Sequence, residues 1–400
     1  MVGGDPGGRG VVATASYEAR AYGIHSAMPA ARARRLCPHA VFLRPRFEVY
    51  TRVAEQIRAL MRQWTPIVEP VSLDEAYLDV TKQAAALSAT EIARRLQQQV
   101  REVTGLSASL GAAPNKMLAK IASELRKPGG LSVIRPEQVA RFMESLPVRR
   151  LPGVGEVTAA RLAALGITRC GQAAARGQAA LQALLGPRSG AWLFERSQGL
   201  DPRPVEPDRP AKSLGHEDTF ARDLLELEAM RAWIGAAAPR LARRLAQAGA
   251  RGRTVVLKVR YPDFTTVTRS MTLERPTAEA GCLAEAGCLL LERTEAARRG
   301  VRLLGLTVSG LDTGGGCLRA AAALAVRRAG TTGRYPRRAP GCAQVIHTAL
   351  RPLKPPGGPV PAARPPGCPI GPAPCGRNRF DRADLRAPAR RCLTRRGPRR

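Results

Sequence analysis

The sequence contains no run of about 18 apolar residues, so it predicts no membrane-spanning helix. Its first residues, Met1–Gly10, are rich in glycine and form no apolar stretch, so we expect no signal peptide. None of the nine cysteines stands in a C-x-x-C pair, which speaks against a zinc site. We therefore expect a cytoplasmic protein with reduced thiols and no structural metal.

Acidic residues are scarce: 32 Asp and Glu face 64 Lys and Arg, which gives a formal charge of +32. Residues 313–400 hold 19 Lys and Arg against two Asp, a net +17, so the preceding residues carry the remaining +15. A surplus of this size on the body of the chain predicts a polyanion partner, and it favours nucleic acid over a small molecule.

The pattern of residues 47–135 predicts helices and strands of one mixed domain. Thr51–Trp64 has apolar residues at the spacing of one helix face, and Ile67–Val80 reads as two short strands around a turn. Ser88 begins a capping-box pattern before the next helix, Leu106–Ala112 reads as a strand, and Asn115 can cap the helix that follows it.

The second half divides into a helical part, a linker, a mixed domain and a tail. Pro136–Gly199 is helical, and the proline-rich Asp201–Pro210 predicts a stiff linker. Ser213–Leu311 has the order β-α-β-β-α-β, with a hairpin whose apolar residues alternate with polar and basic ones. One face of that sheet should pack on two helices and the other should lie against a phosphate backbone.

Residues 313–400 hold 14 of the 33 prolines and show no lasting periodicity. We expect this tail to be disordered, and we expect its deletion to leave the melting of the folded part unchanged.

The sharpest local feature is the adjacent pair Asp74-Glu75 in the turn between two expected strands. Carboxylate oxygens are the ligands that Mg²⁺ prefers, and nucleotidyl transfer uses two such ions. The alternative is a solvated acidic pair without a ligand.

Three further patterns carry groups that can bind phosphates. Tyr17 and Arg20 share a helix face, and Lys127 precedes a Pro-Gly-Gly turn, so each can contact a triphosphate. A half-buried tyrosine beside a surface arginine, and a lysine facing a helix C-terminus, are the alternatives. In Leu-Pro-Gly-Val-Gly, Gly153 and Gly155 let backbone N–H groups approach a DNA phosphate, as in a helix–hairpin–helix; a plain helical turn is the alternative.

Together these motifs resemble those of the Y-family DNA polymerases, most closely of the DNA polymerase IV type. VVATASYEAR, VEPVSLDEAYLDVT, NKMLAKIAS with KPGG, and LPGVG stand in the order of that family. The resemblance runs from Met1 to about Asp312. It implies an α+β multidomain protein shaped as a right hand, with an antiparallel palm sheet, small fingers, a helical thumb with a helix–hairpin–helix, and a βαββαβ little finger.

On this resemblance we expect fingers at 1–46, palm at 47–135, thumb at 136–203, a linker at 204–212, a little finger at 213–312 and a disordered basic tail at 313–400. It implies the following site residues: Asp74 and Glu75 as metal ligands for two Mg²⁺ ions, Glu75 as the catalytic carboxylate, Ala13, Thr14, Tyr17, Arg20 and Lys127 at the incoming dNTP, and Gly153, Gly155, Lys258, Arg260 and Arg269 at DNA.

Two departures from the family pattern affect the expected activity. Family members begin with a strand bearing M-D-x-F-F, whose Asp is a third metal ligand, ahead of the segment where this chain starts. We therefore expect a central palm strand to be missing, and this chain to extend primers poorly. Relatives often end in a sliding-clamp peptide, whereas Gln344, the only glutamine after Asp312, begins no such peptide.

The implied function is low-fidelity, translesion, template-directed DNA synthesis by a monomer that binds primer–template DNA and dNTPs. An inactive DNA-binding remnant or accessory subunit is the alternative, because the third ligand is absent.

Overall fold

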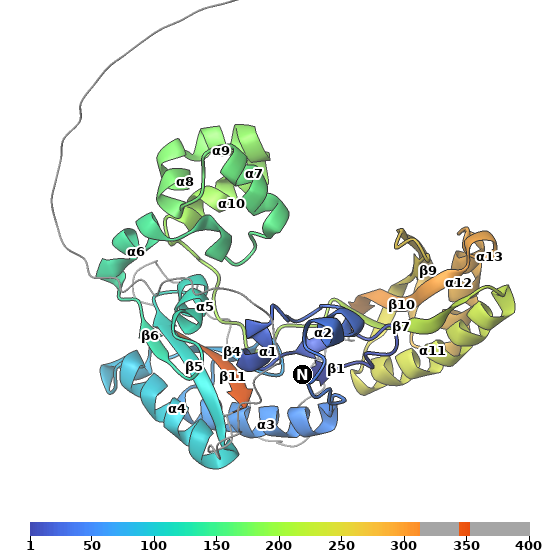
Figure 1. Ribbon diagram of the computed structural model, residues 1–400, viewed down its shortest axis with the longest axis horizontal. Helices are drawn as coiled ribbons and strands as arrows, with labels where there is room; N and C mark the ends of the chain where they lie inside the picture. Colours follow the sequence, from blue (N-terminus) through green and yellow to red (C-terminus); the bar gives the residue numbers. More distant parts are fainter. Residues whose placement is uncertain (313–343, 353–400) are drawn as a thin grey trace, which may run out of the picture. The chain divides into compact units, whose positions relative to one another are not determined.

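The computed structural model describes residues 1–312 and 344–352, which form three sheets with helices around them (Figure 1). Most of the tail expected at 313–400, including its cysteines, falls outside the residues that the structure describes, so the predictions made for that part stay predictions. Within them, no helix is long and apolar enough to cross a membrane.

The N-terminal unit consists of a small two-stranded sheet and two short helices. Its elements are β1 (Val2–Gly3), β2 (Val12–Thr14), α1 (Tyr17–Ala21) and α2 (Ala30–Leu36). The side chain of Ser16 accepts a hydrogen bond from the backbone N–H of Ala19 and so caps α1. Pro29 stands at the N-cap of α2.

The central sheet has five strands in the order β3-β4-β11-β5-β6. Its elements and the helices beside it are α3 (Phe47–Trp64), β3 (Val68–Pro70), β4 (Glu75–Asp79), η1 (Gln83–Ala85), α4 (Ala89–Thr104), β5 (Leu106–Ala113), α5 (Lys116–Leu125), β6 (Leu131–Val133) and β11 (Val345–Pro352). All neighbours are antiparallel except β5 and β6, which are parallel.

Local signals fix the helices that flank this sheet. The Ser88 side chain accepts from the backbone N–H of Glu91 and starts α4, as its capping box predicts. Gly105 ends α4 with a left-handed φ of 67°, a conformation that favours glycine. Asn115 accepts from the N–H of Leu118 and caps α5, which confirms that expectation too.

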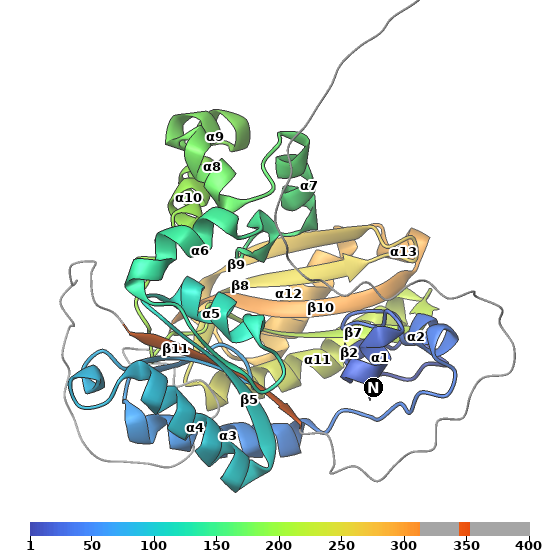
Figure 2. The same ribbon diagram turned by 60° about the vertical axis from the view of Figure 1, so that its left-hand side comes forward.

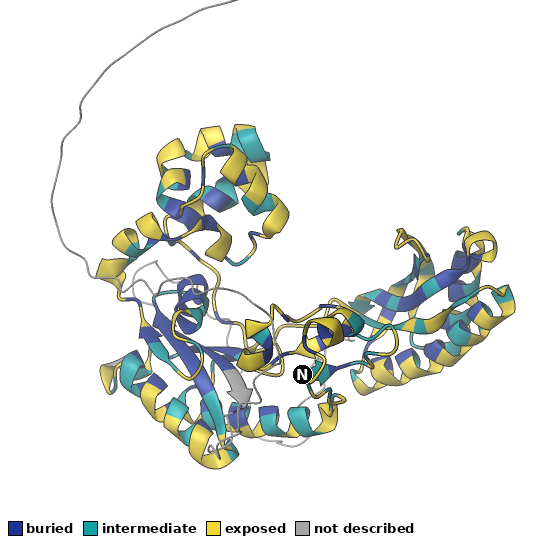
Figure 3. Cartoon of the chain, viewed as in Figure 1, coloured by how far each residue is buried: buried dark blue, intermediate teal, exposed yellow. Residues whose placement is uncertain are grey.

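Because side chains alternate along each strand, the two faces of the central sheet pack into two different hydrophobic cores. Ala76, Leu78 and Ile346 pack with α3 and α4 on one face, while Tyr77 and Val345 pack with α5 on the other. Figure 3 shows these strands as buried, with the outward faces of the helices exposed. Because β-strand side chains alternate between faces, Glu75 also belongs to the α5 face.

Strand β11 corrects two expectations about the chain. It lies in the segment expected to be disordered, and it fills the centre of the sheet where a strand was expected to be missing (Figure 1). Val345–Ala349 pair with Glu75–Asp79 on β4, and Val345–Pro352 pair with Leu106–Ala113 on β5. A segment of this length can be buried between two strands although the sequence around it has no periodicity.

Residues 136–198 form a helical unit. Its elements are η2 (Pro136–Gln138), α6 (Val139–Ser145), η3 (Val148–Arg150), α7 (Glu156–Ala164), α8 (Cys170–Arg176), α9 (Gln178–Leu185) and α10 (Pro187–Ser197). Leu162, Cys170 and Leu193 are buried in its core. Burial raises the pKa of the Cys170 thiol to about 12, so this cysteine serves packing rather than chemistry.

The βαββαβ unit has the predicted element order. It consists of β7 (Ser213–Leu224), α11 (Leu227–Gln247), β8 (Arg251–Arg260), β9 (Thr266–Thr277), α12 (Ala280–Glu292), the short α13 (Ala296–Arg299) and β10 (Val301–Asp312). The strands are ordered β7-β10-β8-β9, and the long helices lie on one face of the sheet (Figure 2). Val255, Leu257 and Val259 are fully buried against these helices, as their alternation predicts.

Candidate active site

The acidic pair lies where β3 turns into β4, and Ser72 organises the turn. The Ser72 hydroxyl donates to Asp74 Oδ1 over 2.6 Å and accepts from the backbone N–H groups of Asp74 and Glu75. Asp74 is exposed, whereas Glu75 is the first residue of β4 and is partly buried. The turn thus carries two consecutive carboxylates, of which Glu75 begins β4 on the α5 face.

Glu75 is held by a lysine that sequence reasoning did not single out. Lys120 Nζ donates to Glu75 Oε2 over 2.8 Å, and both side chains are about one-fifth exposed. Lys120 stands on α5, within the NKMLAKIAS motif, one helix turn after Lys116. Because this ion pair is only partly shielded from water, it orients the Glu75 carboxylate more than it stabilises the fold.

β11 brings a histidine to the same place. His347 is fully buried, its Nδ1 lies 2.9 Å from Ser123 Oγ, and its Nε2 finds no hydrogen-bond partner among the described residues. Burial, together with the charges of Lys120 and Lys127, lowers the pKa of His347 to about 3. The imidazole is therefore neutral at physiological pH, and the 3.9 Å between its Nε2 and Glu75 Oε2 is too long for a hydrogen bond.

The donor set at this edge suits a hard divalent cation, because Asp74 and Glu75 offer adjacent carboxylate oxygens. Among residues 1–312 and 344–352, however, no group of three or more His, Cys, Asp or Glu side chains gathers as a metal site. Ala349 pairs directly with Glu75 across β11 and β4 and is 4% exposed. An apolar methyl group thus occupies the β11 position directly opposite Glu75.

The expected nucleotide-binding residues lie on two parts of the chain. Ala13 and Thr14 are exposed on β2, and Tyr17 is exposed at the start of α1. Arg20 follows on the same helix, and its Nε donates to the backbone oxygen of Ala15 over 3.2 Å. This bond fixes the base of the guanidinium group while the side chain stays only partly buried.

The remaining member of this set, Lys127, lies after α5 in the central unit. Its charge contributes to the low pKa of His347.

The expected helix–hairpin–helix glycines differ from each other in their surroundings. Gly153 has a φ of 109°, and a Cβ there would meet the Trp192 ring at 2.9 Å, so only glycine fits. Gly155 is the N-cap of α7, has ordinary backbone angles and faces open space. The N–H groups at the start of α7 are therefore open to approach by a phosphate.

The βαββαβ unit brings together two of its three expected DNA-binding residues. Lys258 and Arg260 pair with Thr268 and Thr266, so these side chains share the polar face of the hairpin. Arg269 instead pairs with the buried Leu257 and therefore points to the helix side.

Two bonds of Arg269 agree with that placement. Its Nε donates to the backbone oxygen of Arg293, the C-cap of α12, and its Nη1 donates to the backbone oxygen of Thr268. Arg269 thus closes a helix end and does not lie on the polar face.

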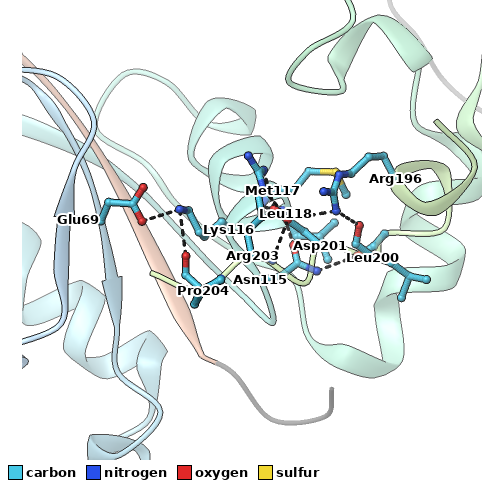
Figure 4. A network of polar contacts seen from close by, with 11 residues as sticks. Glu69, Asn115, Lys116, Met117, Leu118, Arg196, Leu200, Asp201, Arg203 and Pro204 are labelled. Atoms are coloured by element: carbon cyan, nitrogen blue, oxygen red, sulfur yellow. Dashed lines mark hydrogen bonds and ion pairs between the residues drawn. The ribbon is translucent and has the colours of Figure 1, made fainter. Parts of the chain in front are cut away.

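A buried polar network ties α5 to the chain that leaves α10 (Figure 4). Lys116 Nζ donates to Glu69 Oε2 over 2.5 Å and to the backbone oxygen of Pro204 over 3.2 Å. The carboxylate of Asp201, with no exposed surface, accepts from the Met117 N–H and pairs with two arginines.

The two arginines of this network are Arg196, 3.1 Å from Asp201, and Arg203, 2.7 Å from it. Burial acts to raise the pKa of Asp201, but the hydrogen bonds from Arg203 and the charge of Arg196 hold it below its usual value. The network thus fastens the start of the linker to the element that carries Lys120.

Family models and relatives agree with this arrangement. The model of the impB/mucB/samB family matches residues 1–124, that of its C-terminal domain matches residues 211–319, and one for the thumb domain of DNA polymerase-iota matches residues 149–201. The DNA polymerase IV of Alkalilimnicola ehrlichii is 51% identical over 78% of this chain and 88% of that protein. The DNA polymerase IV of Halorhodospira halophila is 47% identical over the same shares.

Solved structures give the same answer for the fold. A Y-family chimera of the Dbh and Dpo4 polymerases is similar with a TM-score of 0.72 and 27% identity, over 78% of this chain and 91% of that one. The insertion ternary complex of Dbh DNA polymerase is similar with a TM-score of 0.55 and 27% identity, over 75% and 87% of the two chains. This chain therefore belongs to the Y-family DNA polymerases of the DNA polymerase IV type, with palm, fingers, thumb and little finger.

Proposed function

We propose that this protein extends a primer 3′ end with dNTPs on a DNA template, with low fidelity and across damaged template positions. The observation that carries the proposal is the pair Asp74-Glu75 at the β3–β4 turn, with Glu75 oriented by Lys120, in a chain of the DNA polymerase IV family. A solvated acidic pair would not need the three hydrogen bonds through which Ser72 shapes the turn.

We assign Asp74 and Glu75 to the binding of two Mg²⁺ ions. Bound there, Mg²⁺ would supply the Lewis acidity that activates the primer hydroxyl and neutralises the triphosphate. Lys120 holds the Glu75 carboxylate oriented towards the α5 face until a cation competes for it.

Tyr17, Arg20 and Lys127 then bind the triphosphate, because they offer a hydroxyl, a forked guanidinium donor and an ammonium group. Ala13 and Thr14 are small and exposed on β2, which suits close approach of the nascent base pair.

Primer–template DNA binds through its backbone to two surfaces. One is the start of α7 with Gly153 and Gly155, and the other is the polar face of the little-finger sheet with Lys258 and Arg260. Arg269 is left out of this surface because it points to the helix side.

For the domains we propose the limits expected from the sequence, with β11 added to the palm because it lies in the same sheet as β4 and β5. We propose a monomer that works in the cytoplasm. Gln344 at the edge of β11 is part of the palm rather than of a clamp-binding peptide.

The expectation of poor activity had two grounds, and one of them does not hold, because β11 fills the palm sheet. The other, the small number of carboxylates at the described site, stays a prediction. The rival function, DNA binding without catalysis, predicts that the chain extends no primer and that substitutions of Asp74 and Glu75 leave its DNA affinity unchanged.

The test is primer extension with Mg²⁺ and dNTPs by the full chain and by Asp74→Asn and Glu75→Gln. Each substitution should cost several kcal/mol of transition-state stabilisation, roughly 10²–10³-fold or more in rate, because it removes a charge at the reacting groups. DNA affinity should change little, and Glu137→Gln, an exposed carboxylate in η2, should leave both unchanged. Extension at the parental rate by either site variant would refute the assignment.

A further inference from the structure

The palm sheet is completed by a strand from a distant part of the chain, and this arrangement has consequences of its own. β4 and β5 are neighbours of β11 and not of each other, so without β11 they would face an open slot. The helices that pack on β4 and β5, α3 and α4 on one face and α5 on the other, all lie between residues 47 and 125. Among the described residues, the strands and helices that form the walls of the slot therefore all precede β11 in the chain.

The slot is lined on both sides by backbone groups that need partners. Val345–Ala349 pair with β4 and Val345–Pro352 pair with β5, so β11 satisfies two strand edges at once. A single extended segment that does this is the arrangement by which sheets take up a peptide as an added strand. Unpaired backbone groups at the centre of a packed sheet would be costly to bury.

The register of β11 is fixed by side chains as well as by the backbone ladder. At one end, the Gln344 N–H donates to Thr81 Oγ1 over 2.9 Å, and its side-chain oxygen accepts from the Ala89 N–H over 3.3 Å. In the middle, the ring of His347 meets Ser123, and on the opposite face Ile346 is fully buried. A strand shifted by one residue would put Ile346 on the face of Ser123 and His347 in the apolar core.

The connection leaves room for the strand to be supplied by another molecule. Residues 313–343 separate β10 from β11, and a chain of that length spans up to about 100 Å when extended. The link to β10 therefore does not dictate which molecule's slot a given β11 occupies.

We propose that the slot between β4 and β5 is a peptide-binding site for residues 344–352, so that β11 binds it as a separable strand. The slot accepts the same segment from a second copy of the chain or as a free peptide. This inference concerns assembly of the palm and does not depend on the chemistry proposed for Asp74 and Glu75.

The test uses the full-length chain with Ile346→Asp, which places a charge where a fully buried side chain was and so weakens its own β11. The probe is a fluorescent peptide of residues 343–353. We expect this peptide to bind the variant saturably. It should bind the parental chain at least tenfold more weakly, because the slot of that chain is filled. A peptide that itself carries Ile346→Asp should also bind the variant at least tenfold more weakly. A scrambled peptide of the same composition is the matched control.

A second variant covers the case in which Ile346→Asp does not keep the palm folded. His347→Ala removes the hydrogen bond with Ser123 and the ring contact with Tyr77 but leaves the backbone ladder of β11, and the peptide should raise the melting temperature of this variant in a concentration-dependent way. If neither variant shows saturable binding or peptide-dependent stabilisation, or if the scrambled peptide performs equally well, the proposal is overturned.

Discussion

Asp201→Asn tests the network that fastens the linker to the palm. The carboxylate of Asp201 has no exposed surface and pairs with Arg196, whose side chain is 8% exposed, and with Arg203, which is 57% exposed. The substitution keeps the shape of the side chain and removes its charge, so Arg196 is left as a buried cation without a counter-ion.

The expected loss in the free energy of unfolding depends on how far Arg196 and Arg203 are buried. Breaking a buried ion pair by removing one partner costs about 3–5 kcal/mol, whereas an exposed pair contributes about 1 kcal/mol or less. The Arg196 pair should therefore dominate, and we expect the free energy of unfolding of this region to fall by about 3–4 kcal/mol. The backbone N–H of Met117 can still donate to the amide oxygen of Asn, so that bond adds little to the loss.

The assay is urea unfolding of the full chain followed by Trp fluorescence, because Trp192 lies on α10 beside this network. Asp208→Asn, an exposed carboxylate in the same linker, is the matched control and should change the free energy by less than about 0.5 kcal/mol. A loss below about 1 kcal/mol for Asp201→Asn would refute the reasoning from burial.

The same residue predicts a pH dependence with a definite sign. The folded-state pKa of Asp201 lies below its ordinary value, so its contribution is fully present above the unfolded pKa of about 3.9. That contribution is lost as the pH falls through the folded pKa. The destabilisation caused by Asp201→Asn, measured at several pH values, should therefore be constant from pH 7 to about pH 5 and shrink below about pH 4.

Three further predictions follow from the palm and the little finger. Deleting 313–400 should destabilise the palm by at least about 3 kcal/mol, because the buried side chains of Val345 and Ile346 are lost with β11. Unchanged urea unfolding would contradict the position of that strand. Ala349→Asp should lower the melting temperature without metal and raise both Mn²⁺ affinity and extension with Mg²⁺, because its carboxylate would face the acidic pair; equal Mn²⁺ affinity in calorimetry would count against this. Lys258→Ala and Arg260→Ala should each flatten the slope of log DNA affinity against log salt by about 0.9, and Arg269→Ala should not; equal slopes for all three would remove the proposed polar surface.

Local signals in the sequence determined much of the fold. The capping residues Ser88 and Asn115 start the helices that they predict, because an N-cap acts within its own turn. The order of the βαββαβ unit follows from alternation in strands and from the 3.6-residue period in helices. The position of Arg269 was also within reach, because residues that alternate with Thr268 and Ser270 must lie on the other face.

The acidic pair could be recognised for a similar reason. Asp74 and Glu75 are adjacent in a turn, and two neighbouring carboxylates there are difficult to explain by packing. Their chemistry is therefore visible in the sequence, although the residues around them are not.

Only the tertiary structure decided what surrounds Glu75. Lys120 is 45 residues away in the chain, and the pair forms because α5 packs on the same face of the sheet from which Glu75 projects. No local pattern encodes that contact. The motif that contains Lys120 has two lysines one turn apart, and the fold assigns Lys116 to Glu69 and Lys120 to Glu75.

The position of β11 is the clearest case. Its residues form a short segment of mixed apolar and polar side chains in a proline- and arginine-rich region, which by itself predicts no partner. Strand pairing is a property of two edges, and the edges that β11 satisfies belong to β4 and β5, more than 200 residues earlier in the chain. The sequence of a strand specifies which of its faces is apolar, but the free backbone groups of its neighbours decide where it binds.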